Sequence, residues 1–355
     1  MHAAAVLLLA TLDLTGHVGA RGGSDDATAH AHLGLDYAPA QWLALHVSGT
    51  EDGLIEAHAT LRRELGLDDV QLRAGTFFLP TSRENRDDNW ASPYTIGFSS
   101  LNAWIGEEVR PIGVDLQYRH ITARGQTLAG GVTAFRGNDT MGTLLAWRGW
   151  SHGDRLSALG ETLSLPSLPS LADDGPFQKQ RDAGTQPFGS DLDGNTGWSG
   201  RVRYGPVQYT YVDNNGDRAL HGDQYSWQTR FHLLGAELGD PDRFIVASEY
   251  MRGDTYMGLG QPFVAADFHS AYVLASLKRG RQRFSARYEL FSTSDRDHSA
   301  AEVNDESGRA WTLTYFFYVT PRLRAGAEFL QVAGHRSETD LTEHTWTFEA
   351  RWRFE

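Results

Sequence analysis

The sequence contains no cysteine, almost no lysine and no long apolar run, and each absence excludes a class of protein. Without cysteine, the 355-residue chain has no disulfide, no thiolate metal site and no cysteine nucleophile. Only Lys179 and Lys278 are lysine and the formal net charge is -13, so nucleic acid is not an expected partner. The longest apolar run, residues 3–10, is far shorter than the roughly 18 residues that a membrane-spanning helix needs.

The start of the chain allows two interpretations. Residues 1–10 resemble the apolar core of a secretory signal, but no Lys or Arg precedes this core and no clean cleavage site follows it. We interpret residues 1–10 as the remnant of a signal peptide; the alternative is that they belong to the folded domain. Residues 11–355 are expected to form one domain, because strand-like segments recur along their whole length with no clear linker.

Strict alternation of apolar and polar residues is what the sequence has in abundance. In residues 342–354, Trp346, Phe348 and Trp352 fall on one face of a strand, and Glu349 and Arg351 on the other. The same division recurs in residues 12–20, 29–37, 55–63, 113–119, 225–233, 284–290 and 322–329. A soluble protein would cover the apolar faces with a second layer. In an outer-membrane barrel these faces meet lipid and the polar faces line a water-filled lumen.

Connections of two kinds alternate along the chain. Short turns fall at residues 38–41, 66–69, 123–126, 151–154, 204–206, 239–242, 278–281 and 320–322. The connections between them are longer or more acidic, and bacterial barrels have this asymmetry of short periplasmic turns and long extracellular loops. The pattern predicts an all-β, transmembrane antiparallel barrel of 18 strands, or 16 if the weakly alternating segment 155–163 is not a strand. Both counts leave an aqueous channel and place the protein in the bacterial outer membrane.

Two connections, residues 80–110 and 166–197, are much longer than the others. The first combines many charges with apolar residues such as Trp104 and Ile105, which need a surface to pack against, so we expect it to be folded rather than disordered. We predict that it folds into the barrel and narrows the pore. The expected constriction and solute-binding residues are Arg83, Arg86, Glu107, Glu108 and Arg110.

The polar strand faces supply the expected lumen wall. Its principal arginines are Arg73, Arg119, Arg201, Arg203, Arg351 and Arg353, and further inner-face candidates are Arg62, Asp115, Arg230, Arg287, Glu289, Arg324, Glu328 and Glu349. One interpretation is that these charges pair with one another and form no dedicated ligand site. The other is that rows of arginine form a path for anions.

One part of the sequence resembles a known family. It runs from residues 73–80 (RAGTFFLP) through Ser-Pro-Tyr and Asn-x-Trp to residues 106–114 (GEEVRPIGV) and an alternating strand. This order is similar to that of phosphate-selective porins of the O/P type, which bind anions through arginine-rich and lysine-rich pore segments. The resemblance implies an outer-membrane porin. The matching stretch departs from that pattern, because acidic residues such as Glu107 and Glu108 stand beside its arginines.

Two further groups of residues were weighed as metal ligands. Residues 191–197 (DLDGNTG) resemble the opening of a calcium loop but lack the third oxygen ligand and the terminal Glu. The histidines His30, His32, His46 and His58 fall on lumen faces of neighbouring strands, where solvated side chains are the default. We expect no metal site and no cofactor. Acidic outer loops on the cell surface would favour divalent cations that bridge to lipopolysaccharide.

The expected function is passive diffusion of small hydrophilic solutes or ions, with anions as the candidate class. The expected partners are outer-membrane lipid, lipopolysaccharide and the solutes themselves, and a homotrimer is the candidate assembly. No nucleophile motif such as G-x-S-x-G is present, so no chemical step is expected. The alternatives are an outer-membrane barrel with an enzymatic or structural role, and a soluble all-β binding protein.

Overall fold

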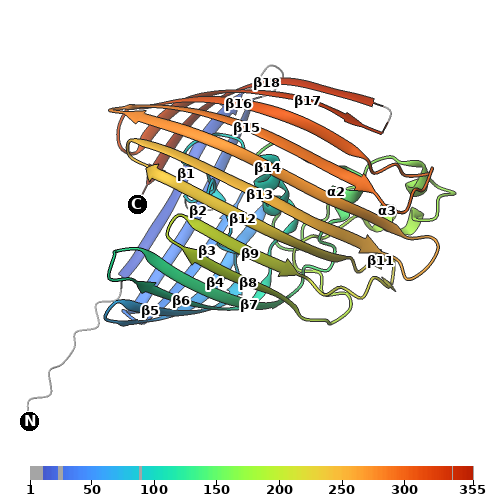
Figure 1. The fold of residues 1–355 in the computed structure, drawn as a ribbon, viewed down its shortest axis with the longest axis horizontal. Coiled ribbons are helices and arrows are strands. Elements are labelled where there is room, and N and C mark those ends of the chain that lie inside the picture. Colours follow the sequence, from blue (N-terminus) through green and yellow to red (C-terminus); the bar gives the residue numbers. More distant parts are fainter. Residues whose placement is uncertain (1–10, 23–26, 88–89, 338, 355) are drawn as a thin grey trace, which may run out of the picture.

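The computed structural model describes residues 11–22, 27–87, 90–337 and 339–354. The predicted signal-peptide remnant, residues 1–10, lies outside them. Sixteen antiparallel strands of the described part close into one barrel, in which β1 pairs with β18 and completes the ring (Figure 1). The prediction of a 16-to-18-stranded antiparallel barrel is thereby confirmed. No helix among the described residues is long and apolar enough to cross a membrane.

The strands follow the predicted alternating segments. The first nine are β1 (Thr11–Gly22), β2 (Ala27–Ala40), β3 (Leu43–Thr50), β4 (Gly53–Leu65), β5 (Asp68–Thr76), β6 (Ile112–Ile121), β7 (Thr127–Arg136), β8 (Gly197–Tyr204) and β9 (Val207–Asp213). The others are β12 (Gln228–Asp240), β13 (Phe244–Met257), β14 (Val264–Arg279), β15 (Gln282–Asp295), β16 (Glu306–Tyr318), β17 (Leu323–Arg336) and β18 (Thr339–Phe354). A separate two-stranded sheet contains β10 (Leu220–His221) and β11 (Gln224–Tyr225).

The outer surface of the barrel is apolar where the alternation predicts it. On β18, Trp346 and Phe348 are 52% and 55% exposed, whereas their neighbours Glu349 and Arg351 are buried. The same strands thus turn aromatic side chains outward and charges inward, the reverse of a soluble sheet. Outward aromatic residues also pack across strands, as Tyr288 does on Trp311 with 4.4 Å between ring centroids.

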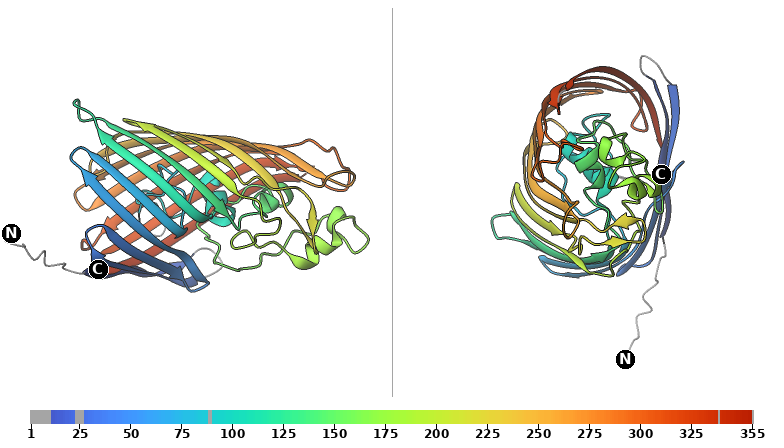
Figure 2. Two further views of the ribbon diagram at one scale, coloured as in Figure 1. Left: turned by 90° about the horizontal axis from the view of Figure 1, so that it is seen from below. Right: turned by 90° about the vertical axis from the view of Figure 1, so that its right-hand side faces the viewer.

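Two long connections leave the ring of strands. The inner loop, residues 77–111, joins β5 to β6 and contains the helix α1 (Ser100–Glu108). The cap loop, residues 137–196, joins β7 to β8 and contains α2 (Thr143–Trp147), the 3-10 helix η2 (Pro169–Leu171) and α3 (Gln178–Ala183). Viewed from the end at which α3 lies, both loops appear within the ring of strands (Figure 2). Strand β1 begins and strand β18 ends at the opposite end, with the short turns (Figure 1).

The cap loop explains why the barrel has 16 strands rather than 18. Residues 155–163 form no strand, so the interpretation of this segment as a strand is wrong. Its side chains pack inside the barrel instead: Leu156 and Ala158 are buried, and the Ser157 hydroxyl donates to the Glu107 carbonyl at 2.6 Å. Since the segment is drawn into the interior, residues 137–196 form a single connection, and the expected upward and downward passes around residues 151–154 do not exist.

Candidate functional site: the lumen and its inner loop

Carboxylates of the barrel wall hold the inner loop in place. Glu328 of β17 accepts a hydrogen bond from the backbone amide of Ile96 at 2.6 Å. Glu289 of β15 accepts one from the amide of Ser100, also at 2.6 Å. These buried glutamates satisfy backbone donors that would otherwise lie unpaired in the lumen. Inner-face acids that the sequence suggested as lumen charges therefore serve as anchors for the loop.

Arg287 of β15 forms the densest of these attachments. Its guanidinium is 1% exposed and pairs with Glu84 of the inner loop at 2.5 Å and with Glu289 at 3.2 Å. It also donates to the backbone carbonyls of Gly97 (3.0 Å) and Phe98 (2.9 Å). A buried guanidinium is tolerated only when its donors are satisfied, and here carboxylates and carbonyls occupy them.

An apolar core lies inside the barrel, between the inner loop and the wall. The indole of Trp104 is 1% exposed and packs on Phe231 of β12 and Phe268 of β14, with centroids 5.3 and 5.2 Å apart. The Trp104 indole N–H donates to the Glu108 carboxylate at 2.7 Å. The apolar residues of this loop were expected to need a packing surface, and the barrel wall provides it.

Because of this core, part of β12 turns its apolar side chains inward and its polar side chains outward. Phe231 and Leu233 are fully buried on the inner side, whereas Arg230 points outward and pairs with Asp254 of β13 at 2.9 Å. The prediction that Arg230 lines the lumen is therefore wrong. Alternation correctly divides the two faces of this strand, but the inner loop presents Trp104 to it, so here the apolar face is the inner one.

The inner loop and the cap loop are joined through Glu108 and Arg110. The Glu108 carboxylate accepts hydrogen bonds from the amides of Leu144 (2.8 Å) and Leu145 (3.1 Å) in α2. The Arg110 guanidinium donates to the Ser157 carbonyl at 2.7 Å. Burial raises the pKa of Glu108 to about 7 and lowers that of Arg110 to about 9, because both side chains are almost completely removed from water.

Three of the five predicted constriction residues therefore lie in the protein interior. Glu108 and Arg110 are 0% and 1% exposed, and Glu107, 5% exposed, pairs with Arg148 of the cap loop at 2.5 Å. Their charges are used in contacts between the two loops and do not meet a solute. The prediction that Glu107, Glu108 and Arg110 line the pore is corrected accordingly.

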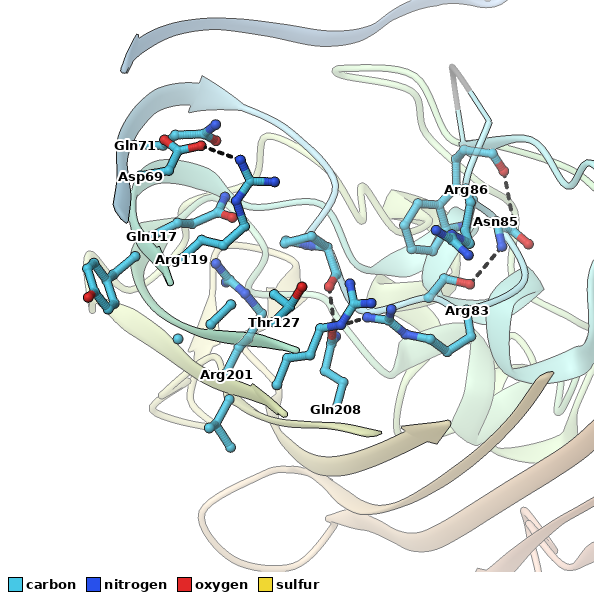
Figure 3. A pocket seen from close by; sticks show the side chains of 18 residues that line it. Asp69, Gln71, Arg83, Asn85, Arg86, Gln117, Arg119, Thr127, Arg201 and Gln208 are labelled. Atoms are coloured by element: carbon cyan, nitrogen blue, oxygen red, sulfur yellow. Dashed lines mark hydrogen bonds and ion pairs between the residues drawn. The ribbon is translucent and has the colours of Figure 1, made fainter. Parts of the chain in front are cut away.

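Arg83 and Arg86 face a cavity of about 430 Å³ that lies between the inner loop and the wall, toward the short turns (Figure 3). Arg119, Arg201 and Arg203 approach the same cavity from the wall. Strands β6 and β8 bring the wall arginines to this point, because Arg119 and Arg203 are both paired in register with Ala129 of β7. Five guanidinium groups from three parts of the sequence are thereby gathered around one space.

The partners of these arginines leave part of their hydrogen-bonding capacity unused. Arg119 pairs with Asp69 at 2.7 Å, and Arg201 pairs with Asp115 at 2.6 Å. Arg203 donates to the Gly205 carbonyl, and no carboxylate oxygen of the described residues lies within 4.0 Å of it. The cavity therefore contains more cationic than anionic side chains.

A second cavity, of about 420 Å³, lies beside the first and has a stronger excess of positive charge. Its cationic lining residues are Arg86, Lys278, Arg283, Arg322, Arg324, Arg351 and Arg353, and its acidic ones are Asp87 and Asp242. Within the described chain, no carboxylate oxygen lies within 4.0 Å of Arg283 or Arg322. Both cavities lie toward the short turns, so the side chains around this end of the lumen have an excess of positive charge.

A third, smaller cavity of about 200 Å³ lies toward the long loops. Its charged lining residues are balanced: Arg21, Arg155 and Arg351 against Glu51, Asp52 and Asp154. Arg351 of β18 lines both this cavity and the second one. The third cavity lies against β1, β2 and β18, and the second against β14 to β18; the inner loop contributes Ser92 to the third and Tyr94 to the second.

All six predicted wall arginines face the interior. Arg119, Arg201 and Arg203 line the first cavity, Arg351 and Arg353 the second, and Arg73 a further one beside β3 and β4. Their contact with a solute stays a prediction. The sequence argument missed Arg21 of β1, which pairs with Asp154 and with Glu349 of β18 and joins the cap loop to the wall. The alternation of residues 12–20 stopped one residue short of it.

The segment that resembles a calcium loop is part of an acidic cluster. Carboxylate oxygens of Asp139, Asp191 and Asp193 lie within 4.8 Å of one another. Backbone donors occupy several of these oxygens: Asp139 accepts from the amides of Leu192 and Asp193, and Asp193 accepts from the amide of Asp217 at 2.7 Å. These bonds give the carboxylates a role in the shape of the loop.

Glu302, between β15 and β16, fastens the cap loop to its neighbour. Its carboxylate is buried and accepts hydrogen bonds from the Trp147 indole N–H (2.6 Å) and the Ser170 hydroxyl (3.1 Å). Burial away from water raises the pKa of Glu302 from its ordinary value of 4.5 to about 7, and the nearby Asp297 carboxylate raises it further.

The attachment of the cap loop is expected to weaken as the pH rises. Between the unfolded pKa of about 4.5 and the folded value of about 7, the attached state binds the proton more tightly, so its stability falls with increasing pH. Proteolysis of the cap loop, corrected for the pH dependence of the protease, should be faster at about pH 8 than at about pH 5.5. In Glu302→Gln, which keeps a neutral side chain, this difference should shrink; an unchanged difference would contradict the assignment.

No protein-family model matches the chain, and no curated protein matches its sequence. Solved structures do. The outer membrane channel DcaP of Acinetobacter baumannii aligns with a TM-score of 0.58 and 12% identity over 97% of each chain. OmpT, an outer-membrane protein of Vibrio cholerae, gives 0.54 and 12% over 97% of this chain and 98% of its own. The fold is that of bacterial outer-membrane proteins. An anion-selective porin from Comamonas acidovorans aligns at 0.51 and 12%, over 97% of this chain and all of its own.

Proposed function

We propose that the protein is a porin-like channel of the bacterial outer membrane, through which small hydrophilic solutes diffuse passively and anions pass preferentially. Transport of this kind needs no cofactor and no chemical step. The observation that carries the proposal is the excess of arginine over carboxylate around the two cavities at the short-turn end. The barrel fold shared with a channel and an anion-selective porin supports it.

The path that best fits the cavities runs between the inner loop and the barrel wall, first along β1, β2 and β18 and then along β14 to β18. A solute from the long-loop side would enter the charge-balanced cavity beside Arg21, pass Arg351, and reach the cationic cavity lined by Arg322 and Arg353. The phosphate preference implied by the O/P-type resemblance stays a finer prediction. Of the arginines in that stretch, Arg83 and Arg86 face a cavity and Arg110 does not.

Planar-bilayer recordings across a KCl gradient test the proposal. We expect a stable conductance with a reversal potential that indicates chloride preference, because the lumen field is positive. In Arg203→Glu/Arg322→Glu, the chloride-to-potassium permeability ratio should fall about fivefold or more, since each unit charge about 4 Å away is worth about 1 kcal/mol in water. Arg309→Glu, at an exposed position on β16, serves as the control. A chain that inserts but does not conduct would overturn the proposal, and cation preference in the parent protein would overturn its anion part.

A homotrimer is the assembly that we propose. One of the compared structures, OmpT of Vibrio cholerae, is described as a trimer form. In this chain the outer face of β1 to β4 is rich in Leu, Val, Ala and Gly, and it contains an apolar groove of about 460 Å³ lined by Leu14, Leu33 and Val47 among others. Light scattering of the detergent-solubilised protein gives the protomer number, and a monomer would contradict this proposal alone.

A further inference from the structure

Three histidines meet at the cavity on the long-loop side. His17 of β1 and His32 of β2 are directly opposite each other in register, and His30 lies on the same face of β2. The His17 ring lies near both of the others: its centroid is 5.3 Å from that of His32 and 5.7 Å from that of His30. His17 was not among the lumen histidines predicted from the sequence, although the alternation of residues 12–20 places it on the polar face.

The ring nitrogens of these histidines have unused coordinating capacity. Both nitrogens of His30 and Nε2 of His32 are buried and have no hydrogen-bond partner among the described residues. His32 is only 7% exposed. A buried polar atom without a partner destabilises the folded state by about 1–3 kcal/mol, so such a cluster is unfavourable unless a ligand binds to it.

The spacing of the rings fits a shared metal ion. With metal–nitrogen bonds of about 2.0–2.1 Å and tetrahedral geometry, two imidazoles on one zinc ion have centroids roughly 5 Å apart. The observed 5.3 and 5.7 Å are close to this value. The ring plane of His17 makes an angle of 66° with those of both partners. The ligand atoms of the three histidines are not all within 4.8 Å of one another in this structure, so a shared ion requires rotations about the side-chain torsions.

A second histidine pair on the same wall shows the contrast. His46 of β3 and His58 of β4 are also opposite each other, with centroids 5.0 Å apart, but their planes are inclined by only 25° and the rings are stacked. Lone pairs in two stacked rings point along parallel planes and do not meet at one ion. The His46 Nδ1 atom also contacts Asp36 at 2.8 Å, so its capacity is already used.

Acidic and basic side chains both lie beside the first cluster. The carboxylate of Glu349 lies 3.8 Å from Nε2 of His30, and Asp154 lines the same cavity. Three arginines, Arg21, Arg324 and Arg351, pair with Glu349. The cavity beside these histidines is lined by equal numbers of basic and acidic side chains, whereas the cavities at the short-turn end have a clear excess of arginine.

We propose that His17, His30 and His32 form a binding site for a divalent transition-metal ion of the zinc or nickel class, with Glu349 as a fourth partner. Neutral imidazole is a favoured ligand of these ions. Because the site faces the cavity that borders Arg351, a bound ion would obstruct the path and change its field. The site itself stands on the histidine geometry, and only its effect on conduction rests on the proposed function.

The experiment uses untagged, metal-free protein folded in detergent, titrated with Zn²⁺ by calorimetry and with Co²⁺ by visible absorption. We expect one tight site per chain and Co²⁺ bands of tetrahedral intensity. His30→Ala/His32→Ala should weaken binding by about 100-fold or more, since two ligands are lost. His46→Ala/His58→Ala is the matched control and should bind like the parent. Heat-dependent electrophoretic mobility verifies that each variant is a folded barrel.

Two results would overturn the proposal: binding that survives in the His30/His32 variant, and loss of tight binding in the control pair instead. Asp193→Asn identifies any ion held by the acidic cluster of the cap loop, and parent-like binding in this variant supports the histidine site. Conductance is recorded separately, with micromolar Zn²⁺ expected to reduce the current. If the folded protein binds Zn²⁺ but never conducts, the proposed function fails and the metal site stands. If it conducts but binds no Zn²⁺, the metal site fails alone.

Discussion

Arg287→Met is expected to detach the inner loop from the barrel wall at a cost of about 3–5 kcal/mol, the usual penalty for breaking a buried ion pair. The substitution removes the guanidinium that pairs with two carboxylates, and Glu84 and Glu289 are left as buried charges without a counter-ion beside them. It also deletes the donors to two carbonyls of the loop. The strand ladder of the barrel does not depend on this side chain, so the ring of strands should persist while the loop moves.

A cysteine probe measures this release without ambiguity, because the chain has no cysteine of its own. Ala103 of α1 is 2% exposed, so a maleimide should label Ala103→Cys slowly in the parent background. In the presence of Arg287→Met, labelling should accelerate by about two orders of magnitude, as a loss of about 3 kcal/mol in local stability implies. Arg309→Met is the control, since it removes an exposed arginine from the next strand. Unchanged protection of the probe would show that Arg287 does not hold the loop.

Trp104→Ala is expected to loosen both loops at once. Truncation of a buried Trp costs about 3–5 kcal/mol through lost burial and the cavity that remains. Here it would empty the space between Phe231 and Phe268 and would remove a hydrogen-bond donor from Glu108. Because Glu108 also accepts from the first amides of α2, the disturbance should reach the cap loop.

Hydrogen exchange resolved by segment tests this coupling. Amides of α1 and α2 should exchange about 100-fold faster in Trp104→Ala than in the parent, whereas amides of β13 to β16 should stay protected. Trp311→Ala, which truncates a Trp that is 48% exposed on the outer face, should leave both helices unaffected. Fast exchange in α1 with an unchanged α2 would show that Glu108 does not couple the two loops.

The strands were predictable because the physics that forms them is local and periodic. A side chain on one face of β18 meets lipid and the next meets the interior, so Trp346 and Glu349 reveal their positions by sequence spacing alone. The prediction failed where a segment distant in the sequence makes the inner side of a strand apolar instead of polar. Arg230 faces outward because Trp104, over a hundred positions away, makes the inner side of β12 apolar, and no local pattern contains that information.

The candidate site was predictable in composition but not in geometry. Wall arginines such as Arg203 and Arg351 follow from alternation and do face cavities. The inner loop has no period, so sequence could not separate Arg83, which faces a cavity, from Arg110, which lies buried under the cap loop. The cluster of His17, His30 and His32 depends on strand register at the seam of the first hairpin, which the turn lengths alone did not determine.

The entry and exit of the inner loop have a consequence for how such a protein can diversify. Thr76 and Ile112, at the ends of β5 and β6, are paired neighbours, so residues 77–111 leave the sheet and return to it one strand spacing away. An insertion, deletion or exchange within this excursion requires no shift of register in the surrounding ring. The loop inside the barrel can therefore change in length or sequence while the strand pairing of the surrounding ring stays the same.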